Sequence, residues 1–208
     1  MYSNNVSDIF YYTLKFKVYY KIYLMKHNIF PALRLTAVCI FLFMIVYPAI
    51  VWAIAQAAPA KGEGEKVTVD GKIVGYKLEG QSFTQDVYFW GRPSAAGYNA
   101  AGSAGSNKGP SNPDYLQQVK DRVDTFLAHN PTIKTAQIPA DLVTASGSGL
   151  DPDISLQAAL VQVDRIASAR GISKPKVSSV IKEYTHSSIN GIDKVNVLDL
   201  NIALDKLK

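Results

Sequence analysis

Cysteine, histidine and charged residues are all scarce in this chain of 208 residues. The single cysteine, Cys39, excludes an internal disulfide framework and a cysteine-based zinc site. Only three histidines are present, which argues against a histidine-rich metal centre, so the sequence predicts no metal site. Charged residues make up 19% and hydrophobic residues 48%, a balance that excludes a disordered chain, which would be polar and charge-rich.

The formal net charge of +5 is concentrated at one end of the chain. Residues 1–34 contain five basic residues and one acidic residue, Asp8, which gives this segment a charge of +4. The rest of the chain contains 17 basic and 16 acidic residues. Because binding to a phosphate backbone needs an excess of positive charge, the sequence predicts no nucleic-acid partner.

One uncharged stretch, residues 35–60, predicts a membrane-spanning helix. Its 26 positions are mostly apolar, and as a helix they would reach about 39 Å, against about 30 Å for the hydrocarbon core of a bilayer. Pro48 is expected to loosen the backbone hydrogen-bond ladder and to kink this helix. A cleaved signal peptide is the alternative, because residues 58–60 have the small-x-small pattern of a cleavage site, although its apolar region is normally shorter.

Basic residues indicate how the predicted helix is oriented. Five of them precede it, whereas few follow it closely. The positive-inside rule therefore predicts a cytoplasmic segment 1–34, a single span at 35–60 and an outer domain formed by residues 61–208. Residues 1–24 are rich in tyrosine and show no clear periodicity, so we hypothesise that Met25 is the natural start and that 1–24 is not native.

Small residues recur at four-residue spacing along one side of the predicted span, at Ala49, Ala53 and Ala57. Such a stripe allows another helix to approach closely in lipid, so these alanines are candidates for packing against a partner helix. The alternative is that alanine is simply common in membrane spans.

The outer domain is predicted to be α+β, helix-rich with a minor β-sheet. Alternating residues around Asp70-Gly71 indicate a hairpin over 66–74. Residues 87–90 could form a buried strand or an aromatic core cluster, and 142–144 are a further strand candidate. Three helices are predicted from their capping residues and apolar spacing: one from Asn112 to Asn130, one from Ser155 to Gly171 and one after Ser173. The Leu-rich stretch 195–207 is ambiguous between strand and helix, and we favour a short helix after Asn196.

Two stretches rich in small residues, 91–113 and 145–152, predict functional loops, because long irregular segments are uncommon inside a compact domain. Neither has a catalytic pattern. Lys108 does not follow a glycine, as a phosphate-binding P-loop requires, and Ser148 lacks the Gly-x-Ser-x-Gly frame of a hydrolase elbow. The sequence therefore predicts no catalytic residue and favours a non-catalytic partner subunit.

Several of these runs together resemble one known family. They are PALR at 31–34, FWGRPSA at 89–95, GSNKGPSNP at 105–113, DLVTASGSGLDP at 141–152 and VNVL at 195–198. In order and spacing they resemble the C subunit of the bacterial potassium-transporting Kdp P-type ATPase, over about Met25 to Leu207.

The resemblance implies a single-pass accessory subunit in the bacterial inner membrane. Its implied partners are a potassium-channel-like subunit and an ATP-hydrolysing subunit, and it implies a catalytic chaperone that raises the ATP affinity of the latter. ATP, shared with that partner, is the only cofactor implied. The resemblance makes five residues candidates for nucleotide contact: Ser146, Gly147, Ser148, Gly149 and Gln162.

The predicted orientation conflicts with direct nucleotide contact, because ATP is cytoplasmic and residues 61–208 are expected outside. We therefore hypothesise that the outer domain braces or covers the external potassium entrance and holds the pump together. A membrane-tethered hydrolase or binding protein that acts alone remains the alternative from another functional class.

Overall fold

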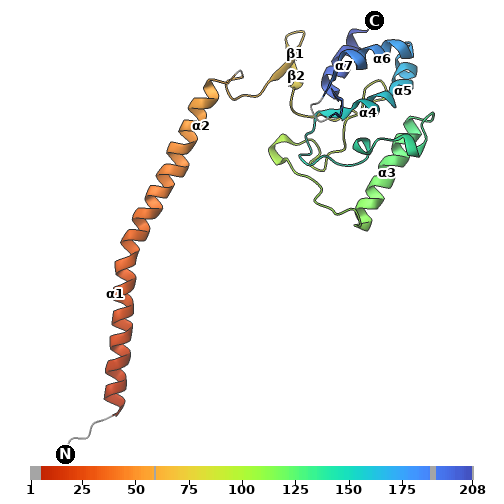
Figure 1. The fold of residues 1–208 in the computed structure, drawn as a ribbon. Helices are drawn as coiled ribbons and strands as arrows, with labels where there is room; N and C mark the ends of the chain where they lie inside the picture. Colours follow the sequence, from red (N-terminus) through yellow and green to blue (C-terminus); the bar gives the residue numbers. More distant parts are fainter. Residues whose placement is uncertain (1–5, 59, 188–190, 208) are drawn as a thin grey trace, which may run out of the picture. The chain divides into compact units, whose positions relative to one another are not determined.

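The computed structural model describes residues 6–58, 60–187 and 191–207 (Figure 1). The chain divides into two compact units, Met1–Glu63 and Gly64–Lys208. The boundary lies three residues beyond the one predicted from the sequence at 60–61.

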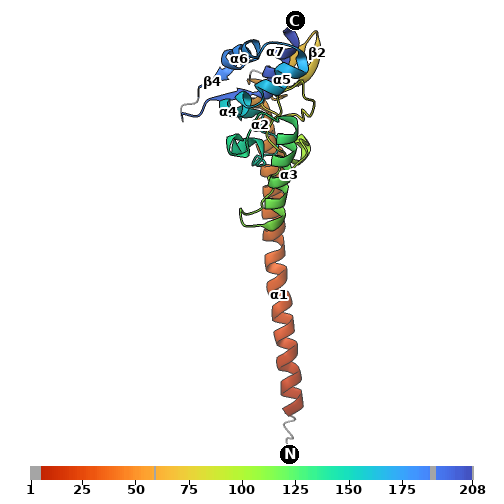
Figure 2. The same cartoon turned by 90° about the vertical axis from the view of Figure 1, so that its right-hand side faces the viewer.

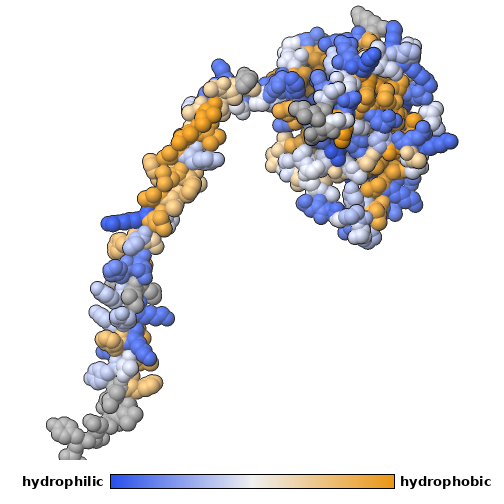
Figure 3. All heavy atoms as spheres, viewed as in Figure 1, coloured by the Kyte–Doolittle hydropathy of each residue, from blue (hydrophilic) through white to orange (hydrophobic). Residues whose placement is uncertain are grey.

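From Val6 to Gln56 the first unit is one continuous helical rod. It consists of α1 (Val6–Ile40), a π-helix η1 (Phe41–Val46) and α2 (Tyr47–Gln56). Within the described residues, 10–56 form the one helix long and apolar enough to cross a membrane. Its apolar surface is nearly continuous in the C-terminal part and mixed with polar side chains further back (Figure 3).

The ends of this rod differ from the prediction. The helix begins far upstream of residue 35 and takes in most of the basic segment, and it ends at Gln56 rather than at residue 60. Pro59, the central residue of the cleavage-like pattern, lies outside the described residues. The π-helix ends directly before Tyr47-Pro48, as expected where a proline offers no N–H and its ring displaces the carbonyl one turn back.

The second unit begins with the predicted hairpin. Strand β1 (Lys66–Val69) pairs antiparallel with β2 (Lys72–Tyr76). Asp70 and Gly71 have φ angles of 49° and 76°. Positive φ at both central positions is the requirement of a type I′ turn, so the hairpin prediction is confirmed.

A second sheet was not predicted. It consists of β3 (Asp153–Ser155), β5 (Lys194–Asn196) and β4 (Thr185–His186), in the antiparallel order β3-β5-β4. Strands of two or three residues are too short to show an alternating pattern, and only the ambiguous stretch 195–207 overlaps one of them, β5.

Both strand alternatives considered elsewhere are wrong. Residues 140–142 form a 3₁₀ turn, η4 (Ala140–Leu142), and 87–90 are not a strand. Phe89 is instead fully buried in the main core, so the aromatic-cluster alternative for this stretch is correct.

The helix predictions are mostly confirmed. Helix α3 (Pro113–His129) has Asn112 as its N-cap, whose side chain accepts from the Tyr115 amide. Helices α6 (Lys174–Glu183) and α7 (Val197–Lys206) begin after Ser173 and Asn196. The short turns η2 (Ala100–Gly102) and η3 (Thr135–Gln137) complete the helical elements.

The helix predicted between Ser155 and Gly171 is wrong in one respect, because it is two helices. Helix α4 (Leu156–Leu160) and helix α5 (Val163–Arg170) are separated by a turn at Val161-Gln162. The predicted ends hold: the Ser155 hydroxyl caps α4, and Gly171, with φ of 66°, ends α5. Two apolar residues of the predicted helices are largely exposed: Leu160 of α4 at 41% and Leu116 of α3 at 53%.

The core lies where helices α4 to α7 meet the three-stranded sheet. In both ribbon views α5, α6 and α7 lie together at one end of the second unit, and α3 lies at the other (Figure 1, Figure 2). The largest fully buried apolar side chains of the core are Phe89, Ile154, Ile166, Ile181, Leu200 and Leu204.

Candidate functional site

The two predicted loops that are rich in small residues, 91–113 and 145–152, lie against each other; we call them the glycine loops. The Ser94 hydroxyl donates to the Gly149 carbonyl at 2.6 Å, and the Ser103 hydroxyl donates to the Ser148 carbonyl at 2.9 Å. The Ser146 amide donates to the Pro93 carbonyl at 3.1 Å. Residues about 50 positions apart in the chain are thereby joined through main-chain groups, which the sequence did not predict.

Close approach explains why glycine stands at position 149. Gly149 has φ of +68°, and a Cβ there would lie 2.8 Å from the Ala104 carbonyl oxygen and 2.9 Å from the Ala96 Cβ. Both the left-handed backbone and the missing space disfavour any side chain. Gly147 differs, because a Cβ at that position would meet nothing within 4 Å.

This difference gives a matched pair of variants. We expect Gly149→Ala to lower the free energy of unfolding by about 1–3 kcal/mol, because it adds backbone strain and a steric clash between the loops. Gly147→Ala should change it by less than about 0.5 kcal/mol. Urea unfolding of the full chain in detergent measures both, and equal losses for the two variants would contradict the packing account.

Of the five candidate nucleotide contacts, the structure brings four together and sets the fifth apart. Ser146 to Gly149 form one loop, in which Ser146 and Gly149 are buried while Gly147 and Ser148 are exposed. Even the exposed Ser148 hydroxyl already accepts from the Leu150 amide at 3.0 Å. None of the described side-chain hydrogen bonds of Gln162 reaches this loop; they go to Trp90, Ala158 and Arg165.

Gln162 lies at the break between α4 and α5 and has no exposed surface. Its Oε1 accepts from the Trp90 amide at 2.8 Å and from Nη2 of Arg165 at 2.5 Å. Its Nε2 donates to the carbonyls of Ala158 and Trp90, at 3.0 and 3.2 Å. The side-chain amide is therefore fully used in holding the chain around Trp90, and none of it faces a ligand.

Arg165 is a buried residue that sequence analysis missed. Its guanidinium lies 4.5 Å from the Trp90 ring, donates through Nη1 to the carbonyls of Asp86 and Tyr88 at 2.7 and 3.0 Å, and donates through Nε to Asn130. Burial lowers the pKa of Arg165 to about 10, an effect that the nearby Asp86 carboxylate opposes. Arg165 is thus charged at neutral pH. The spacing of apolar residues, from which this helix was predicted, says nothing about the role of an arginine between them.

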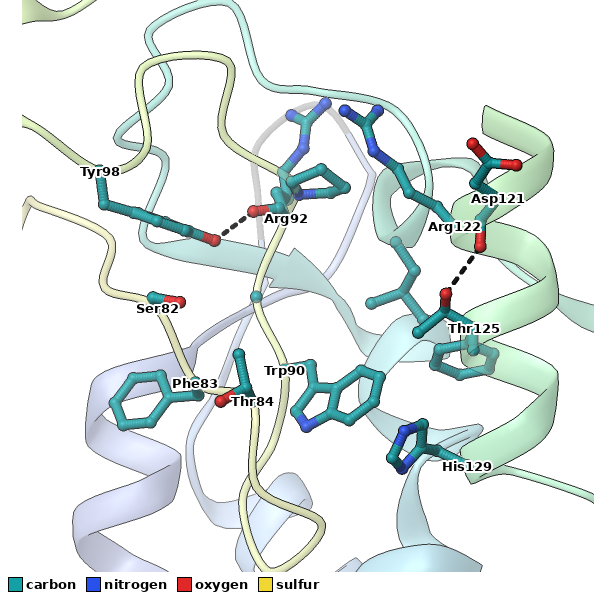
Figure 4. A pocket seen from close by; sticks show the side chains of 14 residues that line it. Ser82, Phe83, Thr84, Trp90, Arg92, Tyr98, Asp121, Arg122, Thr125 and His129 are labelled. Carbon is teal, nitrogen blue, oxygen red and sulfur yellow. Dashed lines mark hydrogen bonds between the residues drawn. The ribbon is translucent and has the colours of Figure 1, made fainter. Parts of the chain in front are cut away.

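A cavity of about 430 Å³ opens beside Trp90, between residues 82–93 and α3; we call it the Trp90 pocket (Figure 4). Its floor is apolar and includes Phe83, Trp90, Phe126 and Leu142. Its polar walls include Arg92, Tyr98, Asp121, Arg122 and His129.

Fixed contacts hold the walls of the Trp90 pocket. The Arg92 guanidinium pairs with Asp151 at 2.9 Å, and the Tyr98 hydroxyl donates to the Arg92 carbonyl. Burial raises the pKa of the Tyr98 hydroxyl, with a smaller contribution from Asp151, so the hydroxyl keeps its proton. His129 packs edge-on against Trp90, with ring centroids 4.9 Å apart.

Within the described parts of the chain, no three histidine, cysteine, aspartate or glutamate side chains are grouped so as to hold a metal ion. The Asp151 carboxylate pairs with Arg92 at 2.9 Å and accepts from the Asp153 amide at 3.1 Å. Burial and the Asp151 charge raise the pKa of Asp153. The Asp151 carboxylate therefore serves the fold.

Comparison with known proteins gives consistent matches. Residues 29–206 match the family described as "KdpC: K+-transporting ATPase, c chain". A protein of Flavobacterium johnsoniae is 54% identical over 181 residues, which cover 87% of this chain and 99% of that protein. Proteins of Bacteroides thetaiotaomicron and Rhodopseudomonas palustris are 49% and 43% identical, over 87% and 88% of this chain. All three are named potassium-transporting ATPase KdpC subunit.

Proposed function

This chain belongs to the KdpC family of K⁺-transporting ATPase c chains and is therefore an accessory subunit of a potassium-transport complex. We propose that it catalyses no reaction itself and acts by holding that complex together. The observation that carries this proposal is the complete internal use of the Gln162 amide. Of the five candidate nucleotide contacts, Gln162 thus has its side-chain amide committed to the fold.

An influence on ATP affinity is compatible with this role if it is indirect. We propose that the chain acts as a catalytic chaperone by stabilising a conformation of the ATP-hydrolysing subunit that binds ATP more tightly. A ligand that binds one state of a protein preferentially shifts the population to that state, and an assembled subunit acts in the same way. Direct contact of Ser146 to Gly149 with nucleotide is the competing mechanism.

The long helix supplies the anchor in this proposal. It spans the inner membrane once, with the basic residues before it in the cytoplasm and the second unit outside, as the positive-inside rule favours. Ala49 and Ala53 on α2, and Ala57 directly after it, are exposed and are available to pack against a helix of a partner subunit.

Cysteine labelling tests the orientation. In a Cys39→Ala background, Ser148→Cys should react with a membrane-impermeant maleimide on intact cells, because Ser148 is exposed in the second unit. Asn28→Cys, exposed on α1 and present whether the chain starts at Met1 or Met25, is the matched control and should react only after permeabilisation. The reverse pattern would place the second unit in the cytoplasm and would favour direct nucleotide contact.

Purification in mild detergent tests the function itself. We expect the tagged chain to bring down multi-span partner chains with potassium-stimulated ATPase activity. An isolated monomer that turns over a small substrate would contradict the proposal and would support the membrane-tethered hydrolase or binding protein that acts alone.

A further inference from the structure

We propose that the Trp90 pocket is the docking site for a neighbouring polypeptide of the transport complex, which inserts one large apolar side chain next to an acidic one. This inference rests on the proposed function, because it names the surface through which the second unit is held by its partner. It follows from the composition of the pocket and from its charges.

The floor of the pocket has the residues expected at the centre of a protein–protein interface. Trp90 and Phe126 meet edge-to-face, with ring centroids 6.4 Å apart, and Phe83 and Leu142 also line the floor. Aromatic residues and arginine dominate the energetics of interfaces, where an apolar centre is surrounded by a polar rim. The Trp90 pocket has both parts, and its volume of about 430 Å³ leaves room for a large apolar side chain.

The rim identifies the charge of the partner. Arg122 donates to the Val143 carbonyl at 3.0 Å, and no ion pair is found for it among the described residues. Arg92 is already paired with Asp151, although its buried Nε has no hydrogen-bond partner. Both arginines line the pocket, and in the view of Figure 4 both guanidinium groups point toward its upper end. A carboxylate is the group that satisfies such an arginine pair.

The other ionisable side chains of the pocket already have hydrogen-bond partners. The Asp121 carboxylate accepts from the neutral side-chain amide of Gln117 at 2.7 Å and keeps its negative charge, and His129 is held by Asp86 at 2.8 Å. The pocket therefore offers an apolar floor and one guanidinium, that of Arg122, for which no ion pair is found among the described residues. This arrangement suits one apolar and one acidic side chain, whereas a nucleoside triphosphate would bring several negative charges to a single cation that lies next to the charged Asp121 in the chain.

Two variant pairs on α3 test the inference. Thr125 lines the pocket, is exposed, and its hydroxyl donates only to the Asp121 carbonyl of its own helix, so Thr125→Trp should fill the pocket from one wall. Asp124→Trp places the same side chain at an exposed neighbouring position that does not line the pocket. Arg122→Glu reverses the charge that recognises the partner, and Lys120→Glu is the matched reversal at an exposed position outside the pocket.

Each variant is purified from membranes through a tag on this chain, and the partner chains that accompany it are quantified. We expect Thr125→Trp and Arg122→Glu to reduce the recovered partner by about tenfold or more, as loss of a central interface contact does. The two controls should stay within about twofold of the unmodified chain. Thermal unfolding of each variant shows whether the fold is kept, and Thr125→Gln replaces the tryptophan variant if that one unfolds early.

The outcomes separate the two proposals. If the pocket variants recover as much partner as their controls, the docking inference is wrong, while the proposed function stands as long as the unmodified complex shows potassium-stimulated ATPase activity. If Thr125→Trp loses the partner and Arg122→Glu keeps it, the acidic part of the inference is wrong. If the unmodified chain recovers no partner, both proposals are wrong.

Discussion

The Gln162→Ala variant should lose about 3–5 kcal/mol of unfolding free energy. The substitution leaves the Trp90 amide and an Nη2 donor of Arg165 without their acceptor, in a place that water does not reach. It also opens a cavity where the side chain packed. Each buried donor left without a partner costs about 1–3 kcal/mol, and the cavity adds to this.

Urea unfolding of the full chain in detergent measures the loss. In a Trp52→Phe background Trp90 is the only tryptophan, so its fluorescence reports on the Gln162 contacts directly. Gln157→Ala, at an exposed position of α4, is the matched control and should cost less than about 0.5 kcal/mol. Gln162→Glu should fall between the two, since a carboxylate still accepts from Trp90 and Arg165 but cannot donate to Ala158.

The same variant separates the two accounts of ATP affinity. If Gln162 acts through the fold, any change in the ATP requirement of the complex should accompany loss of stability or of assembly. A Gln162→Ala complex that is fully assembled and stable, yet needs far more ATP, would contradict the structural role and support direct nucleotide contact.

The Arg165→Leu variant should lose a similar amount, about 3–5 kcal/mol, because it removes a buried charge and leaves its acceptors unpaired. The carbonyls of Asp86 and Tyr88 and the side chain of Asn130 all rely on this guanidinium. Arg165→Lys keeps the charge, but its single ammonium cannot reach all of these acceptors and also lie across Trp90, so it should still cost about 2 kcal/mol or more.

Thermal and urea unfolding of the same full chain measure both substitutions. Lys182→Leu, which removes an exposed positive charge from α6, is the control and should be nearly neutral. If Arg165→Lys were as stable as the unmodified chain, the charge alone would matter and the proposed role of the planar guanidinium would be wrong.

The features found correctly from the sequence are those set by neighbouring residues. The Asp70-Gly71 hairpin depends on two residues that tolerate positive φ, and α3 begins where Asn112 caps the helix and Pro113 fits its first turn. The apolar segment around residues 35–56 was likewise evident from hydropathy alone. In each case the physical cause lies within a few residues of its effect.

The features that were missed depend on residues far apart in the chain. The break at Gln162 exists because its side chain bonds to the main chain of Trp90, 72 positions earlier. The three-stranded sheet forms because β5 returns to lie between β3 and β4.

The sequence by itself determined the membrane-type helix, the main helix ends and the family, since local preference, hydropathy and ordered motifs carry that information. Tertiary structure alone decided what Gln162, Arg165 and the glycine loops do. Whether a polar side chain serves the fold or faces a ligand depends on which distant backbone groups surround it, and only the folded chain brings those groups together.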